Sequence, residues 1–449
     1  PNDAVDAVNA VRSRVGMPGI PYGLSCDQFR LRIRNERRVE LAFEEHRFFD
    51  VRRWKMLDQT DKVITGMKAN SDGSYSRFVV DNNRKAYSEK FLLYPIPGDE
   101  AIRLQNASGT ACSKTDTEVS VPEEETGKKT EIKFLQLNLW VECTKVEHAP
   151  EYLIEQIATL QPDIATFCEL YKGPQDDPVM PKLMQGLKDK GLIYYDARID
   201  GRAVISKYPI KETERINKWM FKAILDVNGK RVAVYPAHSE YRYYTCYYPR
   251  GYNDGSVNWD KLPAPITDVN KILAVCEESD RIESAQAFIN NAAKELEQGA
   301  LVFFAGDLNE PSYLDWQADT KDLFDHRGCI VNWGTSKLLV QRGYKDAYRV
   351  IHPDPVKCPG FTFPADNKSV IPENLSWAPE ADERERIDFV YYYPNKNLQI
   401  KSAQIVGPTG SIVRGQRIEE QTKDPIIPPV NNQWPSDHKG VLITFYIKE

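Results

Sequence analysis

A small, polar and acidic stretch after residue 106 is the feature that most constrains how this chain can fold. Residues 107–129 consist largely of Ser, Thr, Glu, Lys and small residues. Such a segment buries too little apolar surface to offset the entropy lost on ordering, so we predict a flexible linker. At 449 residues the chain is also too long for one ordinary domain. We therefore expect two separate units, residues 1–106 and residues 130–449.

The first unit has mostly helical patterns. Val5, Val8 and Val11 follow one another at helical spacing, which predicts a helix over 3–15. A longer charged pattern predicts one helix over 27–55, with acidic and basic residues three and four positions apart. We interpret these charges as the solvated face of a helix.

After the linker, strand and helix patterns alternate. Strand-like runs occur at 132–138, 163–168, 202–206, 221–227, 231–237, 300–306, 386–393, 400–406 and 440–447. Helical patterns occur at 149–161, 181–190 and 279–297. Many strands with a few long helices between them indicate a layered α/β domain.

Composition excludes some classes of protein. No apolar run approaches the roughly 18 residues of a membrane-spanning helix. The eight cysteines are scattered without a C-x-x-C pair, which argues against a zinc ribbon or a redox motif. A net charge of −6 argues against a protein whose main task is to grip long nucleic acid, although a nuclease with a local basic patch stays open.

Acidic and amide side chains recur at the ends of the predicted strands. They are Asn138, Glu169, Asp307, Asn309, Asp388 and Asp437. Such oxygen ligands suit Mg²⁺, Mn²⁺ or Ca²⁺, and ligands at one edge of packed sheets can converge on one cleft. Turn chemistry is an alternative for Asn138 and for Asp307 with Asn309. An ion pair with Arg386 is the alternative for Asp388, which lies inside an apolar strand and needs a partner.

Two of the six histidines share this position. His238 follows the run at 231–237, and His438 follows Asp437 immediately before the last strand. A lone histidine is more often structural. Two at the same strand edge as several acids favour a functional site.

Seven motifs in this order resemble the endonuclease/exonuclease/phosphatase superfamily over residues 130–449. They are Leu-Asn-Leu-Trp at 137–140, Gln-Pro-Asp-Ile…Cys-Glu-Leu at 161–170, Ala-Val-Ile-Ser-Lys-Tyr-Pro-Ile at 203–210, Ala-His-Ser at 237–239, Gly-Asp-Leu-Asn at 306–309, Arg-Ile-Asp-Phe-Val at 386–390 and Ser-Asp-His at 436–438. The resemblance implies an α/β fold of the α+β type, a four-layer sandwich in which two packed β-sheets are flanked by helices.

The same resemblance implies roles for the site residues. Glu169, with Asn138, would bind Mg²⁺ (or Mn²⁺ or Ca²⁺), and Asp437 would serve the metal or the base.

Five further residues would act on the water and the phosphate. Asp388 would orient His438 as the general base for water, while Asp307 and Asn309 would position the water and the phosphate. His238 would stabilise charge on the phosphate. These roles agree with the chemistry of hydrolysis. A negatively charged phosphoester repels hydroxide, so the reaction needs a cation on the phosphate oxygens and a base for the water.

A tyrosine- and arginine-rich insert at 239–252 departs from the usual pattern of that superfamily. Tyr248 could stack on a base, sugar or inositol ring, and Arg242 or Arg250 could bind phosphate. The alternative is that the tyrosines pack a long loop onto the sheet. The insert leaves the substrate class open.

Residues 1–106 resemble the C-terminal part of the SusD/RagB family of surface glycan-binding lipoproteins. The resemblance rests on the helical motif at 34–54 and on Tyr-Pro-Ile-Pro at 94–97. It implies an extracytoplasmic location (periplasmic, cell-surface or secreted) and a glycan or an outer-membrane transporter as partner.

The leading hypothesis is a metal-dependent phosphodiesterase or phosphatase. The alternative is a surface glycan-binding module for nutrient uptake whose second domain is an inactive passenger. The complete set of acids and histidines favours the enzyme. Among substrates we favour a small soluble phosphoester over nucleic acid or a lipid headgroup, because the sequence has neither a basic stripe nor an apolar hairpin.

Overall fold

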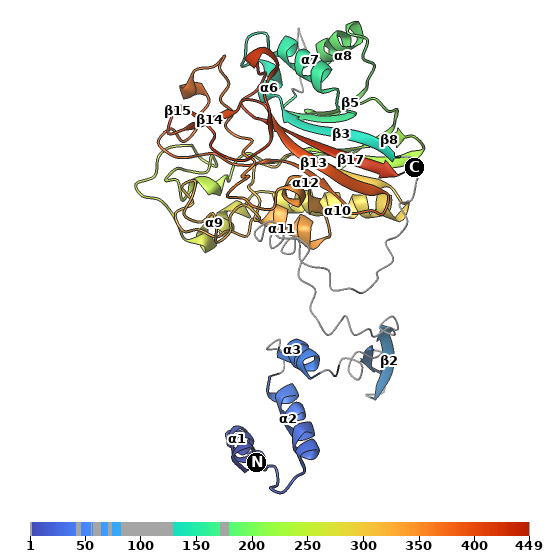
Figure 1. Ribbon diagram of the computed structural model, residues 1–449, viewed down its shortest axis with the longest axis vertical. Helices are drawn as coiled ribbons and strands as arrows, with labels where there is room; N and C mark the ends of the chain where they lie inside the picture. Colours follow the sequence, from blue (N-terminus) through green and yellow to red (C-terminus); the bar gives the residue numbers. More distant parts are fainter. Residues whose placement is uncertain are drawn as a thin grey trace, which may run out of the picture. The chain divides into compact units, whose positions relative to one another are not determined.

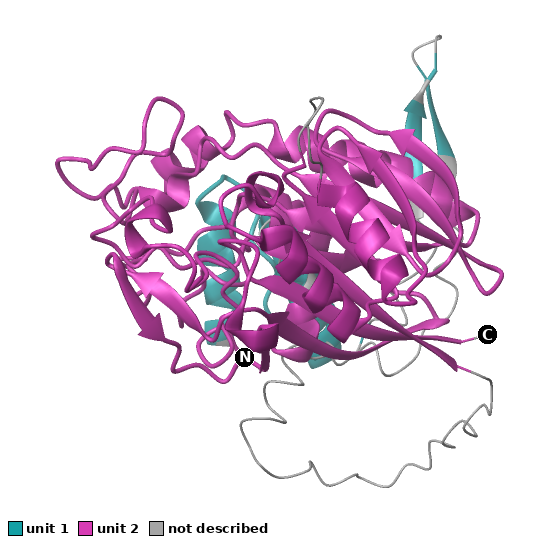
Figure 2. Cartoon of the chain, turned by 90° about the horizontal axis from the view of Figure 1, so that it is seen from above, with its two compact units in different colours: residues 1–101 teal, residues 102–449 magenta. Residues whose placement is uncertain are grey.

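A computed structural model of the chain describes residues 2–41, 46–54, 56, 64–70, 74–81, 129–170 and 179–448 (Figure 1). The chain divides into two compact units, residues 1–101 and 102–449 (Figure 2). Except for Lys129, the predicted linker lies outside the described residues. No helix among the described residues is both long and apolar enough to cross a membrane.

The first unit combines helices with a hairpin. Its elements are α1 (Asn2–Ser13), α2 (Cys26–Glu40), α3 (His46–Arg53) and the antiparallel pair β1 (Ile64–Ala69) and β2 (Tyr75–Asp81). The single helix expected over 27–55 is wrong, because α2 ends at Glu40. An ion pair of 2.8 Å between Arg37 Nε and Asp50 Oδ2 links α2 to α3, so part of the charged pattern joins two helices.

The second unit contains two large β-sheets. The seven-stranded sheet has the spatial order β16 (Ile426–Ile427), β13 (Leu398–Val406), β17 (Gly440–Lys448), β3 (Lys129–Asn138), β4 (Ile164–Cys168), β6 (Arg202–Ser206) and β5 (Tyr195–Ile199). The six-stranded sheet has the order β11 (Lys345–Asp346), β12 (Asp388–Tyr392), β10 (Leu301–Asp307), β9 (Lys230–His238), β8 (Phe221–Val227) and β7 (Ile210–Arg215). A small hairpin pairs β14 (Gly410–Val413) with β15 (Gln416–Glu419).

The two large sheets pack face to face through side chains that alternate along the strands. Phe134 on β3 and Phe445 on β17 meet Phe303 on β10, with ring centroids 5.4 and 5.1 Å apart. These rings belong to one buried cluster that draws on both sheets. The inter-sheet core therefore joins the two halves of the unit.

Helices cover the outer faces of both sheets. The next residue on β3, Leu135, points the other way, into a cluster with α7 (Ala149–Leu160) and α8 (Val179–Asp189). Phe304 on β10 likewise packs against α10 (Arg281–Glu297) and α11 (Gly334–Gln341). Figure 1 shows α7 and α8 on one side of β3 and α10 and α11 on the other. The predicted four-layer α/β sandwich is confirmed.

The strand register brings the predicted site residues to one edge of the sandwich. β3 and β4 are parallel and end together, with Asn138 opposite Cys168. β9 and β10 are also parallel and place His238 opposite Asp307, which in turn faces Asp388 on β12. The backbones of β9 and β10 approach so closely there that a Cβ atom on Gly306 would overlap the Ala237 carbonyl, so this position requires glycine.

Candidate active site

A pocket of about 190 Å³ opens at this edge of the sandwich. Five of the predicted site residues line it: Glu169, Asp307, Asn309, Asp437 and His438. They come from three segments that are far apart in the sequence and that the two sheets bring together.

His438 is paired with a buried carboxylate beneath the pocket. Its Nδ1 lies 2.8 Å from Asp388 Oδ2, and the Asp388 side chain is 0% exposed. Gln136 Nε2 donates to the other oxygen of Asp388 at 3.5 Å, and the Asp388 backbone N–H donates to Thr362 Oγ1 at 3.2 Å. His438 Nε2 is left facing the pocket, 3.9 Å from Asp307 Oδ2.

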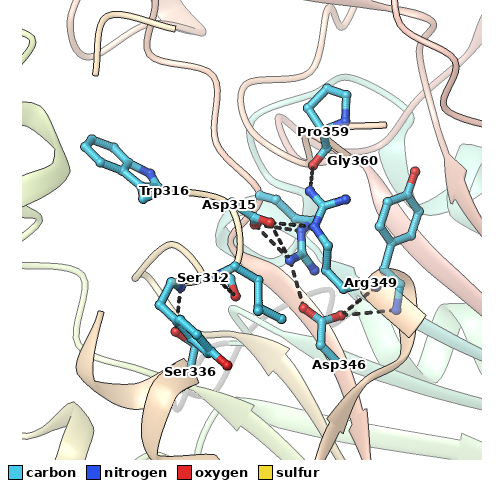
Figure 3. Close-up of polar contacts among 12 residues, drawn as sticks. Ser312, Asp315, Trp316, Ser336, Asp346, Arg349, Pro359 and Gly360 are labelled. Atoms are coloured by element: carbon cyan, nitrogen blue, oxygen red, sulfur yellow. Dashed lines mark hydrogen bonds and ion pairs between the residues drawn. The ribbon is translucent and has the colours of Figure 1, made fainter. Parts of the chain in front are cut away.

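The alternative partner for Asp388 is engaged elsewhere. Arg386 pairs with Asp315 and Asp346, each at 2.8 Å, in a buried ionic cluster. Arg349 pairs with Asp315 in the same cluster (Figure 3). Asp388 therefore pairs with His438 rather than with the neighbouring arginine.

The loop before β17 holds His438 in place through its backbone. The His438 N–H donates to Ser436 Oγ at 3.1 Å, and Trp434 Nε1 donates to the His438 carbonyl at 2.7 Å. The Phe363 ring lies 5.0 Å from the imidazole, centroid to centroid. These contacts fix the imidazole before any substrate is present.

Asn138 connects the carboxylates of the two sheets. Its Nδ2 donates to Glu169 Oε1 and to Asp307 Oδ2, each at 3.0 Å, and its Oδ1 accepts the Trp140 N–H at 2.8 Å. The second oxygen of Glu169 accepts the Val141 N–H at 2.7 Å. Val141 has a φ of 55°, an unfavourable conformation for a β-branched residue, and this turn directs its N–H at Glu169.

His238 completes a group of ligand atoms around Glu169 and Asp307. Its Nε2 lies 3.7 Å from Glu169 Oε1 and 3.8 Å from Asp307 Oδ2. This nitrogen is buried and has no hydrogen-bond partner among the described residues. Burial lowers the pKa of His238 to about 4, so the imidazole is neutral near pH 7. One nitrogen and two carboxylate oxygens lie within 4.8 Å of one another, a donor set that suits a divalent cation.

The site holds more negative charge than its own cations balance. Burial, with the Asp388 charge added, raises the pKa of Asp307 to about 7, and burial raises that of Asp437 to about 7. Burial opposes protonation of His438, but the charge and hydrogen bond of Asp388 outweigh it and raise the pKa of His438 to about 10. Additional positive charge here would relieve the repulsion among the acids.

Asn309 lies at the pocket with its side chain turned back to the protein. Its backbone N–H donates to Asp307 Oδ1 at 2.8 Å, and its Nδ2 donates to the Ser239 carbonyl at 3.1 Å. Asn309 therefore both stabilises a turn, which was the alternative interpretation, and lines the pocket.

The three residues predicted to bind substrate do not line the pocket. Arg242 forms an ion pair of 2.8 Å with Glu240. The Arg250 side chain is 0% exposed and pairs with Glu385 at 2.8 Å. Tyr248 is buried, and its hydroxyl donates to Asp254 at 2.8 Å. Tyr248 and Arg250 thus take part in the loop packing that was the alternative interpretation of the insert, while the Arg242 side chain is about half exposed beside Glu240.

Two supporting residues were missed from the sequence. Gln136 lies two positions before Asn138, and alternation along the strand places both on one face. That spacing could have predicted that Gln136 lies near the site. Thr362 carried no signal, because its contact with Asp388 depends on a loop contributed from elsewhere in the chain.

Two family models match the chain in separate regions. The model described as "Endonuclease/Exonuclease/phosphatase family" matches residues 135–438, which is more than half of the chain. The model described as "SusD family" matches residues 1–107.

Searches of whole proteins found relatives of the chain. It is 27% identical over 318 residues to the uncharacterized protein F14F9.5 of Caenorhabditis elegans, across 70% of this chain and 91% of that one. Among solved structures, D. rerio TDP2 complexed with single strand DNA product has 15% identity and a TM-score of 0.39, over 70% of this chain and 99% of that one. The human Nocturnin catalytic domain with bound sulfate anion has 13% identity and a TM-score of 0.39, over 72% of this chain and 98% of that one.

Proposed function

The chain belongs to the endonuclease/exonuclease/phosphatase family and is a hydrolase acting on phosphoester bonds, and we propose that it works with a divalent metal ion and a water molecule activated by His438. The observation that carries this proposal is the shared pocket. His438, held by Asp388, faces the same 190 Å³ space as Glu169 and Asp307. A base and a cation site within one pocket are what hydrolysis of an anionic ester requires.

The residues present fit a divalent metal ion. Glu169 and Asp307 supply carboxylate oxygens, and the buried Nε2 of His238 has no other partner among the described residues. Asn138 and Asp437 are the further ligands that we propose. The Asn138 amide lies between both carboxylates and would bind the cation through its oxygen after the amide turns, and Asp437 lines the same pocket. We favour Mg²⁺, since oxygen donors predominate; Mn²⁺ or Ca²⁺ would suit the same donor type.

A bound cation would supply positive charge that stabilises the phosphoryl oxygens and lowers the pKa of His438 toward the range in which a base can act. His438 Nε2 then accepts a proton from water as the water oxygen bonds to phosphorus. The bond from phosphorus to the leaving oxygen breaks on the side opposite the attacking water, so the leaving oxygen takes its proton from solvent and His438 later releases its own proton to solvent. Asp388 holds the ring through Nδ1 and stabilises the imidazolium.

Three polar groups position the reacting atoms. Asp307 lies 3.9 Å from His438 Nε2, close enough to orient the attacking water between them. The Asn309 backbone fixes one oxygen of Asp307, and Asn309 is proposed to position the phosphate beside it. His238, on the other side of Asp307, is proposed to stabilise charge on the phosphate.

The experiment that tests this proposal is hydrolysis of bis-p-nitrophenyl phosphate by the full chain with Mg²⁺. We expect His438→Ala to lower kcat by roughly 10²–10⁴-fold, the usual contribution of a general base. His46→Ala, which changes an exposed histidine of the first unit, is the matched control and should keep the wild-type rate. Equal turnover by the wild type and His438→Ala would contradict the role of His438.

The first unit supports a location and a partner for the chain. Because residues 1–107 match the SusD family, whose members are outer-membrane or extracellular proteins, we propose an extracytoplasmic location. A glycan or an outer-membrane transporter is the partner that this unit would contact. Protease digestion of intact cells that produce the protein tests the location, since an exposed chain is degraded while a cytoplasmic marker survives.

A further inference from the structure

Seven aromatic residues line the pocket beside Asp307 and His438. Five of them form what we call the aromatic wall: Tyr241, Tyr244, Tyr247, Trp259 and Trp377. Four belong to the insert that begins at residue 239 and its continuation, while Trp377 comes from a loop more than a hundred residues later. The insert thus contributes aromatic rings to the pocket lining, whereas Arg242 and Arg250, which were predicted to bind phosphate, are not part of that lining.

Four rings of the aromatic wall, those of Tyr244, Tyr247, Trp259 and Trp377, contact one another. Ring centroids lie 4.9 Å apart for Tyr244 and Tyr247, 5.7 Å for Tyr247 and Trp259, and 5.7 Å for Trp259 and Trp377. The inner rings of Tyr244 and Tyr247 are buried. The rings therefore form a continuous packed series that ends at Trp377.

Glu383 fixes the two segments to each other. Its Oε2 accepts the Tyr247 hydroxyl at 2.6 Å and the backbone N–H groups of Trp377 and Ala378, each at 3.1 Å. The Ser376 hydroxyl donates to the other oxygen. A buried carboxylate with this many donors orders the loop that carries Trp377 before a ligand arrives, which lowers the entropic cost of binding.

Two rings of the wall are exposed. Trp377 is 53% exposed and Tyr241 is 55% exposed, although both line the pocket. Large exposed aromatic rings on an ordered frame beside a reactive site offer stacking surfaces, and stacking accepts any planar ring.

The charges that line the pocket restrict which chemical groups a bound substrate can have. None of the described residues that line it is Lys or Arg. Arg242 and Arg250 are occupied by Glu240 and Glu385. The proposed metal ion can thus balance one anionic phosphate, but the pocket offers no Lys or Arg side chain to a second anionic group, which the acids of the site would repel.

We propose that the substrate is a phosphoester whose phosphate carries one uncharged planar ring, and that Trp377 and Tyr241 determine this specificity by stacking on the ring. The inference rests on the proposed function and names its substrate class. A multiply phosphorylated sugar or inositol is the substrate that this pocket disfavours.

The test compares benzyl, cyclohexylmethyl and methyl 2,2,2-trifluoroethyl phosphates, which share one leaving group that has no ring. With Mg²⁺, we expect kcat/KM to be at least about tenfold higher for the benzyl ester than for the methyl ester, with the saturated cyclohexylmethyl ester well below benzyl. Trp377→Ala and Tyr241→Ala should each reduce the benzyl-to-methyl ratio. Tyr195→Ala, an exposed tyrosine on β5 outside the pocket lining, should keep the wild-type ratio.

Several results would overturn the inference. They are equal kcat/KM for the three esters, a cyclohexylmethyl ester as good as the benzyl ester, or a ratio unchanged in both variants. The 2,2,2-trifluoroethyl ester of thymidylate, compared with the benzyl ester, tells whether a nucleobase or a simple aryl group is the preferred ring.

A binding experiment that does not depend on catalysis distinguishes failure of this inference from failure of the proposed function. The melting temperature of the full chain with Mg²⁺ should rise more with phenylphosphonate than with methylphosphonate, and Trp377→Ala should abolish the difference. If no ester is hydrolysed but this difference is present, the proposed function fails and the ring site stands. If esters are hydrolysed but neither the kinetic nor the thermal preference is found, the ring site fails alone.

Discussion

His438 and Asp388 form the pair on which the proposed chemistry depends at the scale of single residues. Their contact of 2.8 Å lies below the pocket floor, where the Asp388 carboxylate is shielded from water. In this environment a carboxylate holds the imidazole in one orientation and stabilises its charged form strongly. Removing only the charge of Asp388 therefore tests the role of this pair more specifically than removing the His438 imidazole does.

Asp388→Asn keeps the size of the side chain and removes the charge. We expect kcat with Mg²⁺ to fall by roughly 10²–10⁴-fold, because the imidazolium formed during proton transfer loses its counter-ion. The measurement is steady-state hydrolysis, with circular dichroism as the check that the fold persists. A loss below threefold in a folded variant would mean that Asp388 has no part in catalysis.

Glu169 tests the metal site without reference to activity. Mg²⁺ at about a hundred times its Kd should stabilise the wild type by about 2.7 kcal/mol, because it binds only the folded chain. Glu169→Gln should lose most of the rise in melting temperature, since a carboxylate ligand is replaced by an amide.

The control for that experiment is Glu297→Gln, which removes an exposed carboxylate from α10. It should respond to Mg²⁺ as the wild type does. An undiminished response in Glu169→Gln would place the cation elsewhere.

Much of the candidate site could be predicted from the sequence, for a physical reason. Asn138, Glu169 and Asp307 follow apolar runs, and the ends of parallel strands share one edge of a sheet, so their proximity follows from the pattern. Arg250 could not be placed in this way. Its burial against Glu385 depends on how two loops fold over each other, and no local spacing encodes that.

At the scale of elements, Glu295 ties α10 to the six-stranded sheet. Its carboxylate, 3% exposed, contacts Lys222 on β8 at 2.7 Å and Arg231 on β9 at 2.8 Å. A carboxylate with two cations at a helix–sheet interface contributes to stability far more than an exposed ion pair does.

Glu295→Gln should destabilise the fold by about 2–3 kcal/mol, less than a fully buried pair because Arg231 is partly exposed. Burial opposes ionisation of Glu295, but hydrogen bonds from Arg231 and Lys222 outweigh it and lower its pKa. This stabilisation is therefore present above the unfolded-state pKa of about 4.3 and is lost as pH falls through the lower folded-state value.

Urea unfolding at several pH values measures this effect. The difference between wild type and Glu295→Gln should be full at neutral pH and should shrink in acid below about pH 4. An unchanged difference at low pH would show that lost packing, and not lost charge, causes it.

Two of the strands that the sequence pattern missed, β5 and β7, are short and polar. They lie at the ends of their sheets, and β7 is mostly exposed, so neither has the apolar run that marks a central strand. The opposite error joined α2 and α3 into one helix, because their charge pattern continues through the break between them. Central strands such as β8 and β10 were predictable, since burial on both faces makes them continuously apolar.

At the scale of the whole molecule, the site residues all belong to the second unit. The hydrophobic core between its sheets and the helices on both outer faces are built from that unit alone. We therefore propose residues 130–449 as an independent catalytic domain, with 1–106 as a SusD-like fragment and 107–129 as a linker.

A protein of residues 129–449 should fold and hydrolyse bis-p-nitrophenyl phosphate with kcat/KM within about twofold of the full chain, because every proposed ligand and base is retained. The comparison requires equal protein concentration and Mg²⁺. A folded domain with no activity would give the first unit a part in catalysis.

The most direct measurement of the central claim is the rate of p-nitrophenolate release by the purified full chain as Mg²⁺ is removed with EDTA and then restored. We predict that turnover stops on removal, returns on restoration and follows a saturating dependence on metal concentration. A rate that is unaffected by complete removal of divalent metal would contradict the claim that the acids and histidines of this pocket act together with a cation.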